Sequence, residues 1–116
     1  MPTDTTLVFI RTTFEALHKW DAADGVIDYL KYPHRHLFHV QMEWEVTHED
    51  RQIEFISMKQ NVDRWIARLG ENEHEPLLIN WSCETYASKL GKVWGATRVM
   101  VSEDGENGAI WIRKDK

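Results

Sequence analysis

Two histidines separated by one residue, His34 and His36, begin a segment in which apolar and polar residues alternate. Side chains of a strand alternate between its two faces, so both imidazoles point the same way, about 6.5–7 Å apart at roughly 3.3 Å per residue. A second alternating segment ends at His18, and pairing of the two segments would bring a third imidazole beside the first two. Buried imidazoles need hydrogen-bond partners or a metal, because burying an unpaired polar group costs on the order of 1–3 kcal/mol.

Three neutral imidazoles from two strands suit a tetrahedral zinc ion that keeps one coordination position open for water or substrate. That is the form of a catalytic zinc site. The alternative is a metal-free set of ordinary surface or hydrogen-bonded histidines, since His-x-His on a strand arises for many reasons. The sequence therefore predicts His18, His34 and His36 as metal ligands, with the metal-free interpretation left open.

Hydrophobic periodicity and turn residues predict the strands and helices that position these histidines. Alternation of period two predicts strands, and apolar residues three and four apart predict helices. A loop with a short helical turn is expected between the first two strands, and Asp-Gly and Asn-Gly pairs within residues 102–108 indicate a hairpin. The predicted elements are strands at residues 7–18 and about 35–48, helices at 54–69 and 82–94, and strands at 97–101 and 109–113.

The order strand, strand, helix, helix, strand, strand predicts one α+β domain spanning residues 1–116. Its expected architecture is ββααββ, with a four-stranded antiparallel sheet and two helices on one face. A chain of 116 residues is long enough for a real core but short for a two-domain enzyme.

Composition narrows the possible partners and the compartment. The net charge of −5 and the lack of a basic stripe argue against a nucleic-acid partner on electrostatic grounds. The chain has no apolar run of the length that spans a membrane, and its N-terminus lacks a basic and apolar leader. We therefore expect a cytoplasmic protein without a membrane partner. The single cysteine, Cys83, is compatible with a reducing compartment and is interpreted as a packing residue.

Four short motifs occur in a definite order along the chain. They are Phe14-x-Ala16-x-His18, then His34-x-His36-x-Phe38, then Glu54-Phe55-x-x-Met58-Lys59, and finally Trp81-Ser82-x-Glu84. In type and order they resemble the 6-pyruvoyl-tetrahydropterin synthase family, which includes the 6-carboxy-tetrahydropterin synthases of the queuosine route. The resemblance implies a T-fold, three histidines that hold zinc, and a homo-oligomer, a hexamer built as a dimer of trimers.

The chain departs from the family pattern at three positions. The family's cysteine base falls at Leu30, which cannot accept a proton, and the family's pterin-binding glutamate falls at about Val101. Arg35 replaces the glycine between the paired histidines, which is expected to bring a bulky cation near the metal. Zinc binding is therefore better supported by the sequence than lyase activity.

If the family chemistry is retained, the substrate is dihydroneopterin triphosphate or a close pterin. Glu84 and Glu103 are then the substrate-binding carboxylates, and His74, oriented by Glu73, is the remaining catalytic base. A competing interpretation is a zinc-bearing T-fold protein that binds a pterin or a purine without lyase activity. A third is a metal-free protein in which the histidines have no ligand role.

Overall fold

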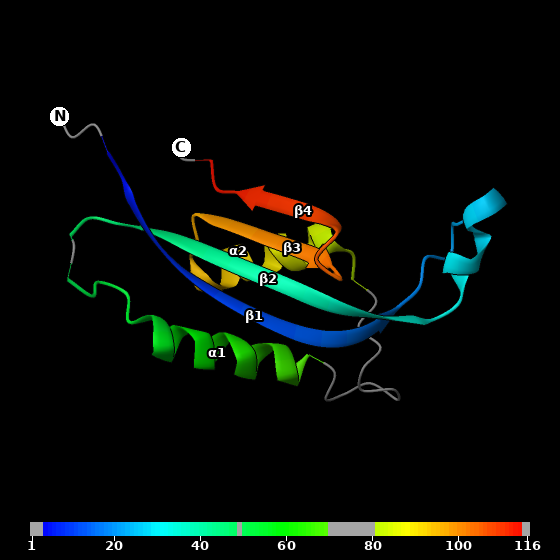
Figure 1. Cartoon of the computed structure of the whole chain (residues 1–116), viewed down its shortest axis with the longest axis horizontal. Coiled ribbons are helices and arrows are strands. Elements are labelled where there is room, and N and C mark those ends of the chain that lie inside the picture. The colour runs from blue at the N-terminus through cyan, green and yellow to red at the C-terminus, as the bar shows by residue number, and fades with distance from the viewer. Residues whose placement is uncertain (1–3, 49, 70–80, 115–116) are drawn as a thin grey trace.

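The computed structural model describes residues 4–48, 50–69 and 81–114. Within these ranges it has four strands, two α-helices and a short 3-10 helix, η1, in the order β1, η1, β2, α1, α2, β3, β4 (Figure 1). This confirms the predicted α+β class and the ββααββ order. The elements are β1 Thr6–His18, η1 Gly25–Lys31, β2 His34–Val46, α1 Phe55–Arg68, α2 Cys83–Trp94, β3 Arg98–Glu103 and β4 Asn107–Ile112.

The strands form one antiparallel sheet in the order β1-β2-β3-β4. β1 and β2 pair along their whole lengths, whereas β3 pairs only with the Phe38 to Glu43 part of β2. The β1–β2 ribbon therefore extends beyond β3, and η1 lies at its far end, away from the helices (Figure 1). The three histidines of the sequence analysis lie on this extension.

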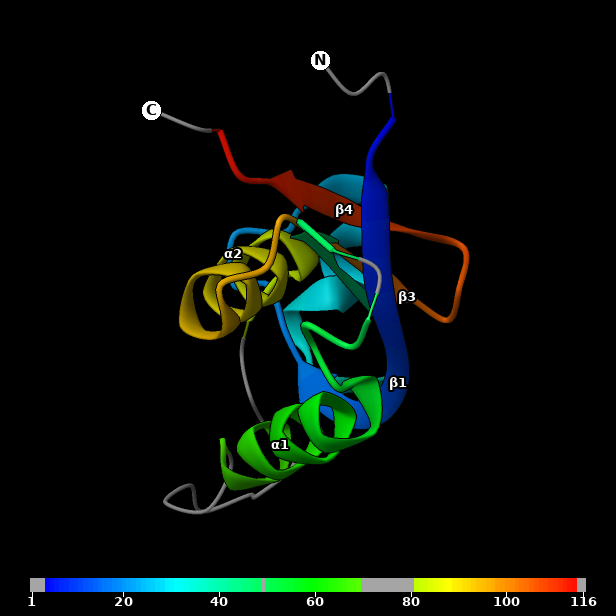
Figure 2. The same cartoon turned by 90° about the vertical axis from the view of Figure 1, so that its left-hand side faces the viewer.

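Both helices pack on one face of the sheet, as predicted. α2 contacts β3 and β4, and α1 contacts β1, so the two helices lie along the same side of a curved sheet (Figure 2). One hydrophobic core joins them, because even-numbered residues of β2 and odd-numbered residues of β3 point toward the helices. Its fully buried members include Phe38, Met42, Val62, Tyr86, Leu90, Val99 and Val101.

Local chemistry sets the ends of the helices. The Glu54 carboxylate accepts hydrogen bonds from the backbone N–H groups of Ile56 and Ser57, and the Ser82 hydroxyl accepts one from the Thr85 N–H. These bonds satisfy N–H groups that the first turn of a helix leaves unpaired. α2 ends at Gly95, whose positive φ is the left-handed conformation that favours glycine.

β3 and β4 each extend further toward the turn that joins them than the sequence predicts. The expected loop at residues 102–108 is a tight turn, because Asp104 and Gly105 both adopt the left-handed conformation of a short hairpin connection. The turn leaves Glu103 as the last residue of β3, paired with Phe38 of β2. This correction matters for the site, because a strand places a side chain on a definite face whereas a loop does not.

The face of the sheet opposite the helices is open. It carries an ion pair of Arg98 with the buried Glu43, whose nitrogen and oxygen are 2.9 Å apart, together with several exposed apolar side chains. Within the described residues, no helix is long and apolar enough to cross a membrane.

Candidate metal centre

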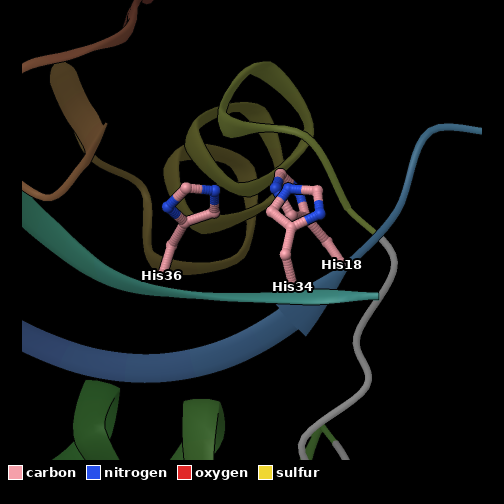
Figure 3. Close-up of side chains that lie close together, drawn as sticks. All are labelled: His18, His34 and His36. Atoms are coloured by element: carbon pink, nitrogen blue, oxygen red, sulfur yellow. The ribbon is translucent and has the colours of Figure 1, made fainter. Parts of the chain in front are cut away.

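Strand pairing brings the three predicted histidines together. In the antiparallel register His18 lies directly opposite His34, and Ala16 lies opposite His36. One ligand nitrogen from each imidazole lies within 4.8 Å of the others, and the ring centroids are 4.5–5.0 Å apart. Figure 3 shows the three rings projecting from the two strands on the side where α2 lies. The predicted grouping of imidazoles is therefore present.

The floor of the group is an aromatic cluster of the core. The Phe38 ring, which is fully buried, lies with its centroid 5.8 Å from that of His18 and 6.2 Å from that of His36. Phe38 in turn stacks on Phe14 at 5.2 Å, and both rings contact Tyr86 of α2. The hydrophobic core thus packs against the histidines, and β3 ends at Glu103, before the part of β2 that carries His34 and His36.

Each imidazole has a hydrogen-bond partner that orients its ring. His34 Nδ1 lies 2.9 Å from the Tyr32 carbonyl oxygen, and His36 Nδ1 lies 2.8 Å from Asp104 Oδ2. His18 forms a hydrogen bond with the backbone of Trp81. Histidines that bind metals commonly use one ring nitrogen for such a contact, which leaves the other nitrogen free for the metal.

Asp104 is itself fixed in place. Its second carboxylate oxygen, Oδ1, accepts a hydrogen bond from the Leu37 N–H at 3.0 Å, and the Asp104 N–H donates to the Leu37 carbonyl at 2.7 Å. The hydrogen bond from His36 is the main reason that the pKa of Asp104 is lowered, with the Leu37 bond second. A carboxylate at this position is therefore well suited to hold the His36 ring.

A second carboxylate, that of Glu103, faces two of the histidines. Its Oε2 atom lies 3.2 Å from His18 Nε2 and 3.0 Å from His36 Nε2. The Glu103 side chain is 23% exposed, so these contacts form at the rim of the core rather than in open solvent. Burial lowers the pKa of His18, with the neighbouring imidazoles adding to the shift and Glu103 opposing it. The lowered pKa favours the neutral form of the His18 imidazole, which is the form that binds a metal.

The donor set fits zinc. Imidazole nitrogen and carboxylate oxygen are both common zinc ligands, and three imidazoles held by hydrogen bonds supply the nitrogen ligands that zinc commonly binds. The residues that could hold the ion are His18, His34 and His36, with Glu103 beside them.

A cavity of about 1100 Å³ lies against the histidines. Its walls come from the β1–η1 segment, the start of α2 and the β3–β4 turn, and they include the aromatic residues Trp20 and Trp81. Glu84 lines this cavity, as does Glu103, so the two predicted substrate-binding carboxylates share one space with the imidazoles. Leu30 lines it as well, at the position where the family resemblance would require a cysteine.

Cys83 also lines this cavity but is buried within the core. Burial raises its pKa to about 11, and the negative charges of Glu103 and Glu84 contribute to the rise. A thiol with this pKa remains protonated near pH 7 and is a poor nucleophile. Its surroundings agree with the prediction that Cys83 is a packing residue.

Other sequence-predicted residues lie elsewhere. Arg35 does not approach the imidazoles as expected, because the alternation of β2 turns it to the opposite face. There its guanidinium nitrogen lies 3.7 Å from the Glu15 carboxylate. Glu54 caps α1 and does not line the cavity beside the histidines. Glu73 and His74, the predicted catalytic pair, lie outside the described residues.

Two features of the site are not evident in the sequence. Asp104 is recognisable there only as part of an Asp-Gly hairpin signal, and its contact with His36 depends on the pairing of β2 with β3. His18 also contacts the backbone of Trp81, and a backbone contact cannot be predicted from the type of residue that makes it. Alternation along the strand places the Glu103 side chain on the same face as the histidines. This alternation was the sequence feature that could have indicated its contact with them.

Comparison with known proteins gives no independent assignment. A scan against protein-family models finds no match to this chain, and neither does a search of curated proteins.

Proposed function

We propose that this chain is a zinc-binding T-fold protein of the 6-pyruvoyl-tetrahydropterin synthase type that acts in the cytoplasm on a pterin such as dihydroneopterin triphosphate. The observation that carries the proposal is the group of three hydrogen-bonded imidazoles within 4.8 Å of one another. In this proposal His18, His34 and His36 hold zinc. When bound, the ion supplies Lewis-acid polarisation of the substrate's side-chain hydroxyls.

The cavity beside the histidines supports a flat, polar substrate. Trp20 on its wall is 52% exposed and offers an aromatic face against which a pterin ring can stack. Glu84 lies at the start of α2, where an ionised carboxylate is an acceptor for two adjacent N–H groups of such a ring. The family's pterin-binding glutamate falls at about Val101, and Glu103, two residues further along the strand, is the carboxylate that would take over this role.

The family's cysteine base falls at Leu30, which cannot accept a proton, so the proton-transfer step needs another base. His74, oriented by Glu73, remains the candidate that the family resemblance indicates. General base catalysis contributes typically 10²–10⁴-fold in rate, so a replacement in a different position would yield slower turnover or a related cleavage of the pterin side chain.

The second candidate function is binding of a pterin or a purine without turnover. It is favoured by Leu30, an aliphatic side chain in the cavity where the family has its base, and by Val101, which is fully buried in the core. The two functions share the metal and the cavity, and they differ only in whether a product forms.

The test is the metal content of the purified protein, followed by incubation of that sample with dihydroneopterin triphosphate and analysis of the pterins. About one zinc per chain together with a new pterin is the expected result. About one zinc per chain with unchanged substrate would support the binding function instead. Absence of stoichiometric zinc would contradict both.

A pair of variants assigns the metal to the proposed ligands. His36→Ala should abolish stoichiometric zinc without unfolding the chain, because the His36 side chain lies at the rim of the core. His39→Ala is the matched control, since this exposed histidine lies on the opposite face of the same strand and should leave the zinc content unchanged. Equal zinc content in the two variants would show that the three-histidine assignment is wrong.

A further inference from the structure

Glu103 is placed to do more than contact a substrate. We propose that its carboxylate is the fourth ligand of the metal, so that the resting centre is a closed site of three imidazoles and one carboxylate. This inference rests on the proposed three-histidine metal site and changes its character, because a catalytic zinc with three protein ligands keeps an open position whereas a site with four does not.

The donors and acceptors around His36 leave a place for a cation. A neutral imidazole has one N–H and one lone pair. If Nδ1 donates to Asp104 at 2.8 Å, then Nε2 presents its lone pair to Glu103 Oε2 at 3.0 Å. Two acceptors at that separation repel each other unless a proton or a cation lies between them. His18 Nε2 converges on the same oxygen at 3.2 Å, and one cation bound by all three atoms would satisfy them together.

The distances from Glu103 Oε2 to the two Nε2 atoms agree with those of a tetrahedral site. Zinc ligands lie about 2.0–2.1 Å from the ion, so neighbouring ligand atoms of a tetrahedral site are about 3.3 Å apart. The separations of 3.0 Å and 3.2 Å between Glu103 Oε2 and the two Nε2 atoms are close to that value. The oxygen therefore already lies at the position of a neighbouring ligand relative to both nitrogens.

The backbone fixes Glu103 in this position. The residue ends β3 and pairs with Phe38, whose ring supports the imidazoles. The turn that follows is closed by a hydrogen bond of 3.1 Å from the Glu106 N–H to the Glu103 carbonyl oxygen. Ligands carried on paired strands are held more precisely than ligands on free loops.

The proposal predicts how the metal responds to loss of this one carboxylate. The probe is Co²⁺, titrated into metal-free wild type, Glu103→Gln and Glu106→Gln, with its visible absorption recording the ligand set. Glu103→Gln keeps the size of the side chain but removes its charge. Glu106→Gln is the matched control, because Glu106 belongs to the same turn and lines the same cavity.

We expect Glu103→Gln to bind Co²⁺ at least tenfold more weakly than wild type and to give a different absorption spectrum. Loss of an outer-shell partner already costs roughly 10–100-fold in metal affinity, and loss of a direct ligand should cost no less. Azide, a small anion that occupies open coordination positions, should change the Co²⁺ spectrum of Glu103→Gln at concentrations that leave the spectra of wild type and Glu106→Gln unchanged.

Two further outcomes separate this inference from the proposed function. If all three proteins bind Co²⁺ with the same affinity and spectrum, and azide acts on all of them alike, the fourth ligand is refuted and the three-histidine site stands. If wild type binds no Co²⁺, the metal site itself is refuted, and this inference with it. Glu103→Asp provides a second variant with the charge kept and the reach shortened. It should bind azide more readily than wild type, and an unchanged response would also overturn the proposal.

Discussion

At the scale of single residues, the candidate centre is defined by what lies behind each imidazole as much as by the imidazoles themselves. The Tyr32 carbonyl, the Trp81 backbone and the Asp104 carboxylate each bond to one histidine. Among these three contacts only that of Asp104 is made by a side chain, so it is the one that a substitution can remove directly.

We expect Asp104→Asn to weaken zinc binding by roughly 10–100-fold, the range found for losses of outer-shell partners. The amide removes the negative charge that supports the His36 ring. Asparagine also tolerates the positive φ of this position, so the turn should be preserved. The measurement is competition for zinc against a chromophoric chelator.

Asp21→Asn is the control for that substitution. Asp21 lines the same cavity, and its carboxylate pairs with Lys19 at 3.6 Å rather than with a histidine. Its removal should change the zinc affinity little. If the two variants lost affinity equally, the effect would come from the charge of the cavity and not from the support of His36.

At the scale of elements, the two helices begin with caps of different chemistry, and pH should distinguish them. Hydrogen bonds from the Ser57 and Ile56 N–H groups lower the pKa of Glu54 from its ordinary value of 4.5. A group whose pKa falls on folding stabilises the folded state above its unfolded pKa, and this contribution is lost as pH falls through the folded value. Ser82, the cap of α2, does not titrate in this range.

We therefore expect Glu54→Gln to be less stable than wild type at about pH 7 and to approach wild-type stability at about pH 3. Ser82→Ala should lose about 1 kcal/mol of unfolding free energy at both pH values, because its cap is neutral. Urea denaturation followed by circular dichroism measures both differences. A Glu54→Gln difference that stayed the same at the two pH values would contradict the charged-cap assignment.

At the scale of the whole molecule, the sheet of the described residues has two free edges and an open face. β1 and β4 are the outer strands, and their unpaired backbone groups can accept another strand. The open face carries exposed apolar side chains near both edges, among them Phe9, which is 50% exposed, and Ile112, which is 58% exposed. These features favour edge-to-edge assembly of several copies, as the T-fold resemblance implies.

The expected result of sedimentation at micromolar concentration is a closed homo-oligomer, a hexamer in the form that the resemblance implies. Phe9→Lys should shift the protein to smaller species, because it places a charge on the exposed face of edge strand β1. Val26→Lys is the control, since Val26 is almost fully exposed but belongs to η1, outside both edge strands. A monomeric wild type would contradict the assembly.

Sequence periodicity alone determined most of the fold. Alternation over residues 7–18 and 35–48 matches β1 and β2 closely, and the apolar spacing and caps of both helices match α1 and α2. These features are local, because side-chain direction repeats every two residues in a strand and about every 3.6 in a helix. The same parity placed His34 and His36 on one face.

Only the tertiary structure decided what surrounds the histidines. The contacts of Glu103 and Asp104 with imidazoles far away in the sequence depend on the register in which Phe38 faces Glu103. A shift by one residue would turn Val99 and Val101 out of the core, so the alternation excludes it. A shift by two residues would keep every side chain on its face but move Glu103 along β2, away from His36, and alternation cannot choose between that register and the observed one. The three histidines could therefore be predicted as ligand candidates from the sequence, whereas the carboxylates and backbone groups that contact them could not.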